Sequence, residues 1–305
     1  MQLFQNLKFK KGVEAITGAG TLRRDVSMAE YTSFKCGGTV NWFIEPKSRQ
    51  QLSSLVKYLR SIDKKYMILG NGSNTLFSDG PHDIVVIHLG DVFARMGVKG
   101  RSLTAGCGAL LSTVAREAAR NSLTGLEFAC GIPGSIGGAV YMNAGAYGKE
   151  MADVIDYVTL MDTNGNIQQR FGEELGLNYR KSSMQSNGMI LLDATFKLEK
   201  KSQTLIFDQM KEYNTKRAEK QPLQYPSAGS FFRRPTGYFA GKLIQDCGLK
   251  GLQLGGAQVS DMHAGFIINT GNATATDIIN LMHVIQETVY NKEKVRLFPE
   301  VRIIE

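Results

Sequence analysis

Two glycine-rich stretches constrain the fold of this chain more than any other feature of its sequence. The first, Gly70–Asn74, directly follows the apolar run Tyr66–Leu69, and the second runs from Gly131 to Gly148 with six glycines in eighteen residues. The chain has 33 glycines against 7 prolines, so these runs indicate places where the backbone turns tightly or approaches another group closely. They predict either cradles for phosphate groups or a glycine-rich crossover that binds nothing.

The spacing of the glycines excludes two familiar phosphate-binding loops. After Gly70 and Gly72, Thr75 stands where a dinucleotide-binding Gly-x-Gly-x-x-Gly needs its third glycine. No Gly-Lys-Ser or Gly-Lys-Thr occurs, so there is no Walker loop. Because each run follows strand-like or apolar sequence, the pair favours a large phosphate-bearing ligand held in another way.

Hydrophobic periodicity predicts an α+β chain of two or three domains. The residues Leu52, Leu55, Val56 and Leu59 form the buried stripe of a helix, and Asp162–Gly165 has the composition of a turn. Three further helices are expected: one over 110–121, a second that ends at about Lys220, and a third over Thr276–Val289. The expected strands are Val40–Ile44, Tyr66–Leu69, Ile84–Leu89, Val154–Met161, Met189–Phe196 and Val301–Ile304.

Composition and charge exclude several classes of function. The net charge of +8 suits an enzyme that attracts anionic substrates. Basic residues are spread along the chain without interleaved aromatics, so we expect no nucleic-acid partner. The N-terminus shows no secretory signal and no run of about 18 apolar residues occurs, so we expect a cytoplasmic protein without a membrane segment. The four cysteines, which are far apart in the sequence, do not have the spacing of a zinc site, so we expect reduced thiols and no bound metal. They are Cys36, Cys107, Cys130 and Cys247.

Nine motifs along residues 25–305 resemble those of the UDP-N-acetylenolpyruvoylglucosamine reductase (MurB) family, in that family's order. Nine motifs in sequence are far more specific than any one of them. The compact C-terminal region is similar to the shorter class of the family, which lacks an additional tyrosine-bearing loop. The motifs are Leu69–Asn74, Gly125–Glu127, Gly131–Ala139, Met142–Gly148, Asn178–Ser182, Pro226–Phe232, Gly241–Ile244, His263–Phe266 and Pro299–Arg302.

The resemblance implies an FAD-binding fold of the vanillyl-alcohol-oxidase/PCMH type, made of two subdomains, followed by a C-terminal α+β substrate-binding domain. The first subdomain is expected over 1–80 and the second over 81–204. The substrate-binding domain is expected over 205–294, with the strand in 295–305 returning to the first subdomain.

The family also implies a reaction. NADPH, as co-substrate, reduces bound FAD, and the enolpyruvyl ether of UDP-N-acetylglucosamine is then reduced to UDP-N-acetylmuramate for peptidoglycan. We expect a monomer. The residues that the resemblance assigns to FAD are Leu69, Gly70, Asn71, Gly72, Ser73, Asn74, Gly131, Ile132, Pro133, Gly134, Ser135, Gly137, Gly138, Ala139, Asn143, Gly145 and Ile190.

Three residues are the expected catalytic group by the same resemblance. Arg180 binds the substrate carboxylate, because a planar guanidinium can bind a carboxylate through two hydrogen bonds. Glu300 flanks that carboxylate, and Ser230 donates a proton to carbon. From the residues alone, Arg180 also fits a surface salt bridge, Glu300 the end of a closing strand, and Ser230 a turn.

Substrate contacts are expected from five further residues. Lys220 resembles a lysine that contacts substrate or NADPH, and Arg234 stands where some relatives have asparagine. His263 is expected near the nucleotide sugar, although a structural imidazole explains it equally well. Tyr179 and Gly229 complete this group.

Two other functions fit the sequence. The chain could be a flavoenzyme of the same fold that acts on another small molecule. It could also be a non-enzymatic protein that binds anions or nucleic acid, which predicts binding that weakens steeply with salt and no flavin absorbance.

Overall fold

The computed structural model describes the backbone of residues 2–305 and the side chains of residues 6–305. The chain divides into two compact units. The first contains residues up to Asp25, Asn41–Asn71 and Asp83–Thr215, and the second contains Val26–Val40, Gly72–His82 and Lys216–Glu305. The domain boundaries expected from the sequence remain a prediction.

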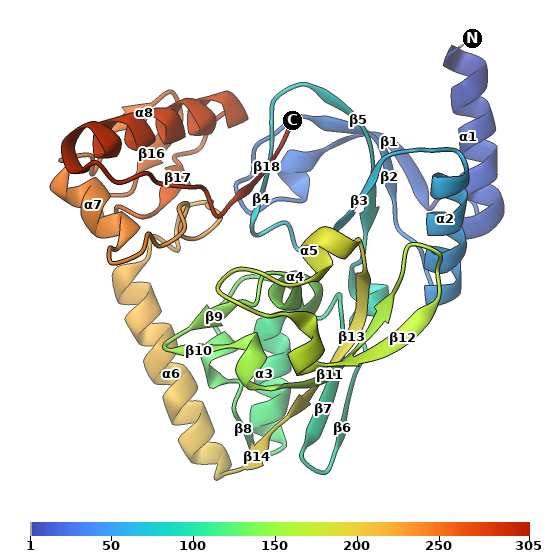
Figure 1. Ribbon diagram of the computed structural model, residues 1–305, viewed down its shortest axis with the longest axis horizontal. Helices are drawn as coiled ribbons and strands as arrows, with labels where there is room; N and C mark the ends of the chain where they lie inside the picture. Colours follow the sequence, from blue (N-terminus) through green and yellow to red (C-terminus); the bar gives the residue numbers. More distant parts are fainter. Residues whose placement is uncertain (1) are drawn as a thin grey trace. The chain divides into compact units, whose positions relative to one another are not determined.

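The first unit is built around two sheets (Figure 1). A four-stranded sheet has the order β1 (Leu22–Ser27), β2 (Thr39–Ile44), β5 (Pro81–His88), β3 (Tyr66–Leu69). A five-stranded sheet has the order β12 (Ile167–Phe171), β11 (Ile155–Met161), β13 (Ile190–Lys197), β7 (Ser102–Gly106), β6 (Met96–Lys99). All neighbours in the five-stranded sheet are antiparallel, whereas β3 and β5 are parallel.

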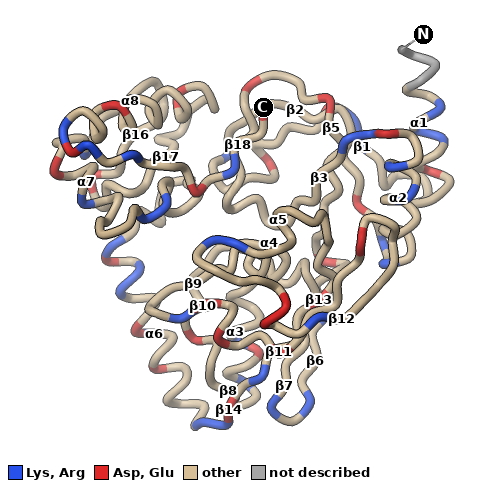
Figure 2. The backbone as a smooth tube through the Cα atoms, viewed as in Figure 1, with Lys and Arg blue, Asp and Glu red and all other residues tan. Residues whose placement is uncertain are grey.

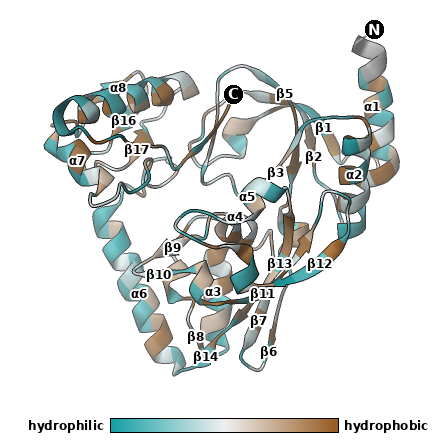
Figure 3. Cartoon of the chain, in the orientation of Figure 1, coloured by the Kyte–Doolittle hydropathy of each residue, from teal (hydrophilic) through white to brown (hydrophobic). Residues whose placement is uncertain are grey.

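The helices that pack on these sheets form where apolar residues recur along one face of the helix. α2 (Arg49–Ser61) buries the predicted Leu52, Leu55, Val56 and Leu59, and the Oγ of Ser48 caps it by accepting from the N–H of Gln51. α3 (Leu111–Arg120) buries Val114, Ala115 and Ala118 in the same way. Both helices were correctly predicted. The largest core cluster includes residues of both sheets and of α2 and α3, and hydrophobic residues, brown in Figure 3, lie on strands and helices alike.

The remaining elements of the first unit are short, apart from two helices. α1 (Gln2–Thr17) packs beside α2, and α6 (Gln203–Lys220) continues into the second unit. The short elements are α4 (Ile136–Tyr141), α5 (Met184–Asn187), β8 (Leu123–Thr124), β14 (Glu199–Lys200), β9 (Gly145–Ala146) and β10 (Lys149–Glu150).

The second unit combines a three-stranded sheet with two helices. The sheet has the order β15 (Gln253–Leu254), β16 (Ala257–Val259), β17 (Ile267–Asn269), and the helices are α7 (Ala240–Asp246) and α8 (Ala275–Glu293). The carboxylate of Asp79 accepts from the N–H groups of Ala275 and Thr276 at 3.0 and 2.8 Å, which satisfies the first turn of α8. A parallel pair of β4 (Thr75–Phe77) and β18 (Arg302–Ile304) completes the unit.

Most predicted elements are found within one or two residues of their expected ends, but β5 begins three residues earlier than expected and α8 ends four residues later. Several elements were not predicted, among them α1, β1, β6, β7 and β12. The Asp162–Gly165 turn leads from β11 into β12, an edge strand that the sequence did not predict. All four cysteines are free and buried, as expected for reduced thiols. Burial raises the pKa of Cys36 to about 12, and Asp79 and Asp277 add to this shift. Basic and acidic residues are interspersed in both units (Figure 2).

Over the described residues, no helix is both long and apolar enough to cross a membrane. The same part of the chain holds no cluster of histidine, cysteine, aspartate and glutamate side chains suited to a metal ion.

Candidate functional site

The Gly70–Asn74 loop presents a row of main-chain donors. In the part of the chain that the structure describes, the N–H groups of Gly70 to Asn74 donate no main-chain hydrogen bond. Successive N–H groups that are not used within the protein suit a phosphate group, because its oxygens only accept hydrogen bonds. The loop therefore fits the pyrophosphate of a dinucleotide without help from a lysine.

Two glycines in this loop are required by close contacts. A Cβ on Gly70 would lie 2.3 Å from Oγ of Ser135, which places the first glycine-rich stretch against the second. Gly72 has φ +60°, and a Cβ there would lie 1.9 Å from the carbonyl oxygen of Tyr31. Gly72 does not accept a larger residue without movement of the backbone, whereas at Gly70 the side chain of Ser135 would have to move.

The second glycine-rich stretch is bonded mostly to its own unit. The N–H groups of Ile136 and Gly137 donate to the carbonyls of Ala109 and Cys107, both at 2.8 Å. Ser135 caps α4, its Oγ accepting from the N–H of Gly138 at 3.5 Å. This stretch forms a rigid wall, and among its described N–H groups those of Gly131 and Ser135 are not used by the main chain.

The other residues assigned to FAD lie around these two loops. Leu69 ends β3, Ile190 begins β13, and both are buried. Asn143 is completely buried, and its side chain bonds to the protein at both ends, which leaves only its main chain for a ligand. Pro133 and Gly138 are exposed, whereas Ile132, Gly134 and Gly145 are partly buried and Ala139 is buried.

Arg180 and Tyr179 lie in the first unit, on a turn closed by two hydrogen bonds between Asn178 and Lys181, each 3.0 Å. Arg180 has φ +54°, a conformation that costs a non-glycine residue about 1–2 kcal/mol. Its guanidinium carbon lies 5.2 Å from the centre of the exposed Tyr179 ring. The turn therefore holds a cation and an aromatic ring together at a strained position, which is a common property of functional sites.

Ser230 and Glu300 lie in the second unit, on two segments that run side by side. The N–H of Glu300 donates to the carbonyl of Phe231 at 2.8 Å, and Phe232 pairs with Pro299 in an antiparallel bridge. This register places Ser230 one residue beyond the Phe231–Glu300 pair. The structure thus brings the main chains of two expected catalytic residues together although they are 70 positions apart in sequence.

The loop that carries His263 is also bonded to the Ser230 segment. The N–H of Phe231 donates to the carbonyl of Gly265, whose own N–H donates to Nδ1 of His263 at 3.0 Å. Because Nδ1 accepts, the proton of the neutral ring is on Nε2, which can donate to a ligand. Burial lowers the pKa of His263 below its usual 6.5 and keeps the ring neutral near pH 7.

The remaining substrate candidates are also in the second unit. Arg234 is exposed, and its guanidinium carbon lies 3.8 Å from the centre of the Phe239 ring. Lys220 is exposed at the end of α6, and Gly229, with φ +75°, precedes Ser230. Sequence reasoning did not find Asn74 as a support for Glu300. The Nδ2 of Asn74 donates to the carbonyl of Glu300 at 3.1 Å, and its carbonyl accepts from the N–H of Arg302 at 3.0 Å.

Comparison with known proteins agrees with the fold and the loop. Residues 40–169 match the family described as "FAD binding domain". A glucose dehydrogenase, Phl p 4.0202, shares the fold with a TM-score of 0.52 and 16% identity over 64% of this chain and 44% of that chain. These observations define a flavoprotein with an FAD-binding domain of the PCMH type and an α+β fold, as expected.

The particular family follows from the rest of the chain. Residues 221–304 match "UDP-N-acetylenolpyruvoylglucosamine reductase, C-terminal domain". The reductase of that name from Limosilactobacillus fermentum is 49% identical over 91% of this chain and 92% of its own length, and that from Clostridium novyi is 45% identical over 99% and 98%. The crystal structure of the Thermus caldophilus reductase (MurB) covers 93% of this chain and 100% of its own, with TM-score 0.81 and 36% identity. The chain belongs to the UDP-N-acetylenolpyruvoylglucosamine reductase family and is an oxidoreductase.

Proposed function

We propose that this protein uses NADPH to reduce the enolpyruvyl group of UDP-N-acetylglucosamine enolpyruvate, giving UDP-N-acetylmuramate for peptidoglycan synthesis. FAD is the bound cofactor and NADPH the co-substrate. The observation that carries the proposal is the pairing of the Ser230 segment with the Glu300 segment, within a chain that matches the family over nearly its whole length. The protein acts as a cytoplasmic monomer.

The residues present fit the cofactor. The unused N–H groups of Gly70–Asn74 support a contact with the FAD pyrophosphate, and the wall formed by Gly131–Ala139 supports the neighbouring part of the molecule. When bound, FAD supplies the hydride that the methylene carbon of the double bond receives. The protein must then hold the negative charge that develops on the adjacent carbon and its carboxylate, and must deliver one proton to that carbon.

Arg180 and Ser230 divide these two tasks. The guanidinium of Arg180 holds the carboxylate through two parallel hydrogen bonds and stabilises the developing charge. The Oγ–H of Ser230 donates the proton to carbon, and Glu300 lies beside the carboxylate. Because a free serine is a weak acid, this role requires neighbours that stabilise its alkoxide. Tyr179, Lys220, Gly229, Arg234 and His263 contact the nucleotide sugar.

The two halves of the reaction can be measured separately. An anaerobic NADPH titration should bleach the flavin absorbance, and added substrate should restore it. Failure of NADPH to bleach a yellow protein would instead favour another flavoenzyme of this fold. We expect Ser230→Ala to leave the bleaching step nearly intact and to slow reoxidation by substrate by roughly 10²–10⁴-fold. Ser227→Ala, which changes a serine in the same segment, is the control. Equal slowing of both steps by Ser230→Ala would make Ser230 structural.

Arg180→Lys tests the carboxylate contact. An ammonium group cannot reproduce two parallel hydrogen bonds, so this variant should also slow reoxidation selectively. Lys181→Gln removes a charge from the neighbouring residue and serves as the control. Normal turnover of Arg180→Lys and Arg180→Ala would remove Arg180 from the catalytic group.

A further inference from the structure

The turn that carries Arg180 is attached to the C-terminal end of α4. The Nδ2 of Asn143 donates to the carbonyl of Asn178 at 3.1 Å. The Nε2 of Gln185 donates to the carbonyls of Arg180 at 3.1 Å and Tyr141 at 2.9 Å. Since α4 lies within the second glycine-rich stretch, the expected substrate arginine and the expected flavin wall share one support.

Asn143 is one of two buried residues in this attachment, the other being Ser182, whose Oγ donates to the carbonyl of Tyr141 at 2.7 Å. Its side chain has no exposed surface, and its Oδ1 accepts from the N–H of Ala152 at 3.0 Å while its Nδ2 binds Asn178. Its φ of +43° is one that asparagine adopts more readily than most residues. A side chain held at both ends in this way fixes the position of the Asn178 carbonyl relative to α4. Gln185, by contrast, is exposed and can exchange its contacts with water.

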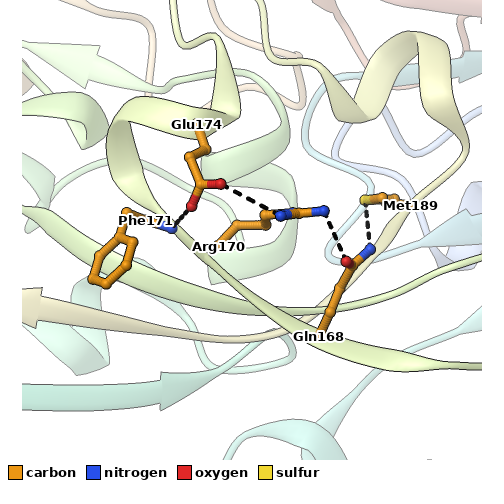
Figure 4. Close-up of polar contacts among 5 residues, drawn as sticks. All are labelled: Gln168, Arg170, Phe171, Glu174 and Met189. Atoms are coloured by element: carbon orange, nitrogen blue, oxygen red, sulfur yellow. Dashed lines mark hydrogen bonds and ion pairs between the residues drawn. The ribbon is translucent and has the colours of Figure 1, made fainter.

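The segment before the turn has its own supports, which do not involve Asn143 (Figure 4). The carboxylate of Glu174 accepts from the N–H of Phe171 at 2.7 Å and from Arg170 at 3.4 Å. Arg170 also donates to Gln168 at 2.9 Å, and Gln168 contacts the sulfur of Met189 at 3.8 Å. These contacts fix the end of β12 and the start of the following segment. The Asn143 contact then holds the turn at Asn178, before Arg180, while Ser182 holds the chain after it.

We propose that Asn143 is a positioning residue that sets the place of the Arg180 guanidinium through the Asn178 carbonyl. This inference rests on the proposed role of Arg180 in binding the substrate carboxylate. It assigns to Asn143 a task in the substrate half of the site instead of a side-chain contact with FAD. Loss of the contact releases the turn and lets the strained φ of Arg180 relax, which moves the guanidinium away from the carboxylate.

The test is a double-mutant cycle on the purified flavoprotein. Asn143→Gly keeps the positive φ accessible and removes both side-chain hydrogen bonds. It should slow flavin reoxidation by substrate by roughly 10–10²-fold, because a displacement of about 1 Å has that effect on a positioned group. Bleaching by NADPH should stay within about twofold of the parent, since that step does not use the carboxylate contact. Asn178→Ala, which removes an exposed side chain and keeps the carbonyl that Asn143 binds, is the matched control.

The second arm places Asn143→Gly in an Arg180→Ala background. If Asn143 acts through Arg180, the added mutation should change the reoxidation rate by less than about twofold there. The affinity for UDP-N-acetylmuramate, measured by calorimetry, should fall in both single variants and fall no further in the double variant. An undiminished effect of Asn143→Gly in the Arg180→Ala background would overturn the inference, as would a folded Asn143→Gly protein with normal reoxidation.

Two results distinguish a failure of this inference from a failure of the proposed function. Normal reoxidation by Arg180→Ala would refute the proposed role of Arg180, and the inference with it. Slow reoxidation by Arg180→Ala with normal reoxidation by Asn143→Gly would refute the inference alone. If Asn143→Gly does not fold, Asn143→Asp keeps the acceptor for Ala152. Only the protonated carboxyl of the aspartate can donate to the carbonyl of Asn178, and burial raises the pKa of that carboxyl. Reoxidation of the flavin should therefore accelerate in this variant as pH falls through that pKa. A pH profile parallel to that of the parent would count against the inference.

Discussion

Asp193 joins the two sheets of the first unit through a single carboxylate. It lies on β13, with a side chain that is 10% exposed, and one oxygen accepts from Arg49 of α2 at 2.6 Å. The other oxygen accepts from the hydroxyl of Thr159 on β11 at 2.9 Å. α2 belongs to the region of the four-stranded sheet, so this contact connects two layers that the main chain joins only through loops.

The expected cost of losing the charge follows from these contacts. A hydrogen bond to a charged group contributes about 1.5–3 kcal/mol. The Arg49 side chain is 49% exposed and regains water when its partner is removed, so the lower part of that range applies. Asp193→Asn keeps the acceptor for Thr159 and should lower the free energy of unfolding by about 1–2 kcal/mol. For a unit of this size that corresponds to a Tm lower by about 2–8 °C.

Thermal unfolding followed by calorimetry and by release of flavin fluorescence would measure this effect. Thr159→Val is the matched control, because it removes the other hydrogen bond to the Asp193 carboxylate, keeps the contact with Arg49, and should cost about 1.5–3 kcal/mol. If Asp193→Asn unfolds within about 0.3 kcal/mol of the parent, the connection contributes nothing and the reasoning is wrong.

Three further outcomes are expected. Gly70→Ala should lower flavin retention and cost about 1–3 kcal/mol, because its Cβ meets Oγ of Ser135 at 2.3 Å. Ser135→Ala in the same chain should restore most of the loss, since the next atom lies 3.5 Å from that Cβ. If the second change does not help, the steric explanation is refuted. Because the pKa of His263 is lower in the folded protein than its usual 6.5, the unfolded chain binds the proton more readily. The stability of the protein should therefore decline as pH falls below about 6.5, and this decline should be smaller in His263→Gln. Asp79→Asn should destabilise the second unit by about 0.5–2 kcal/mol by weakening the cap of α8, and chemical denaturation with a probe in α8 would detect it; a loss confined to the first unit would contradict the assignment.

The sequence predicted the elements whose side chains alternate between core and solvent with a regular period. α2 is an example, because its buried positions recur with the period of a helix. The core strand β13 was predicted from a different signal, a mostly apolar run, and it is buried at every position from Ile190 to Phe196. α1 was not predicted, since Phe9 and Val13 are the buried apolar residues of its described part and do not form a long stripe. β12 was missed because every second residue is exposed and none is fully buried, as befits an edge strand.

The candidate site was predicted only as a set of residue types in order. The resemblance assigns Asn143 and Asn74 to FAD, which stays a prediction, and it did not indicate that their side-chain amides bind the carbonyls of Asn178 and Glu300. A hydrogen bond from a side chain to a distant carbonyl has no signature in sequence, because any residue type can supply the carbonyl. The positive φ of Arg180 was likewise invisible, since arginine has no preference for that conformation.

The pairing of β4 with β18 also determines when this part of the chain can fold during synthesis. Asn74 and its partner Glu300 are 226 positions apart, and ribosomes add about 5–20 residues per second. The strand that follows the first glycine-rich loop therefore waits about 10–45 s during synthesis for the segment that completes it. During that interval the five-stranded sheet, whose strands all precede residue 198, can already form, while β4 remains an unpaired edge. The newly made chain thus depends on its last strand to protect an edge that was exposed since early in translation.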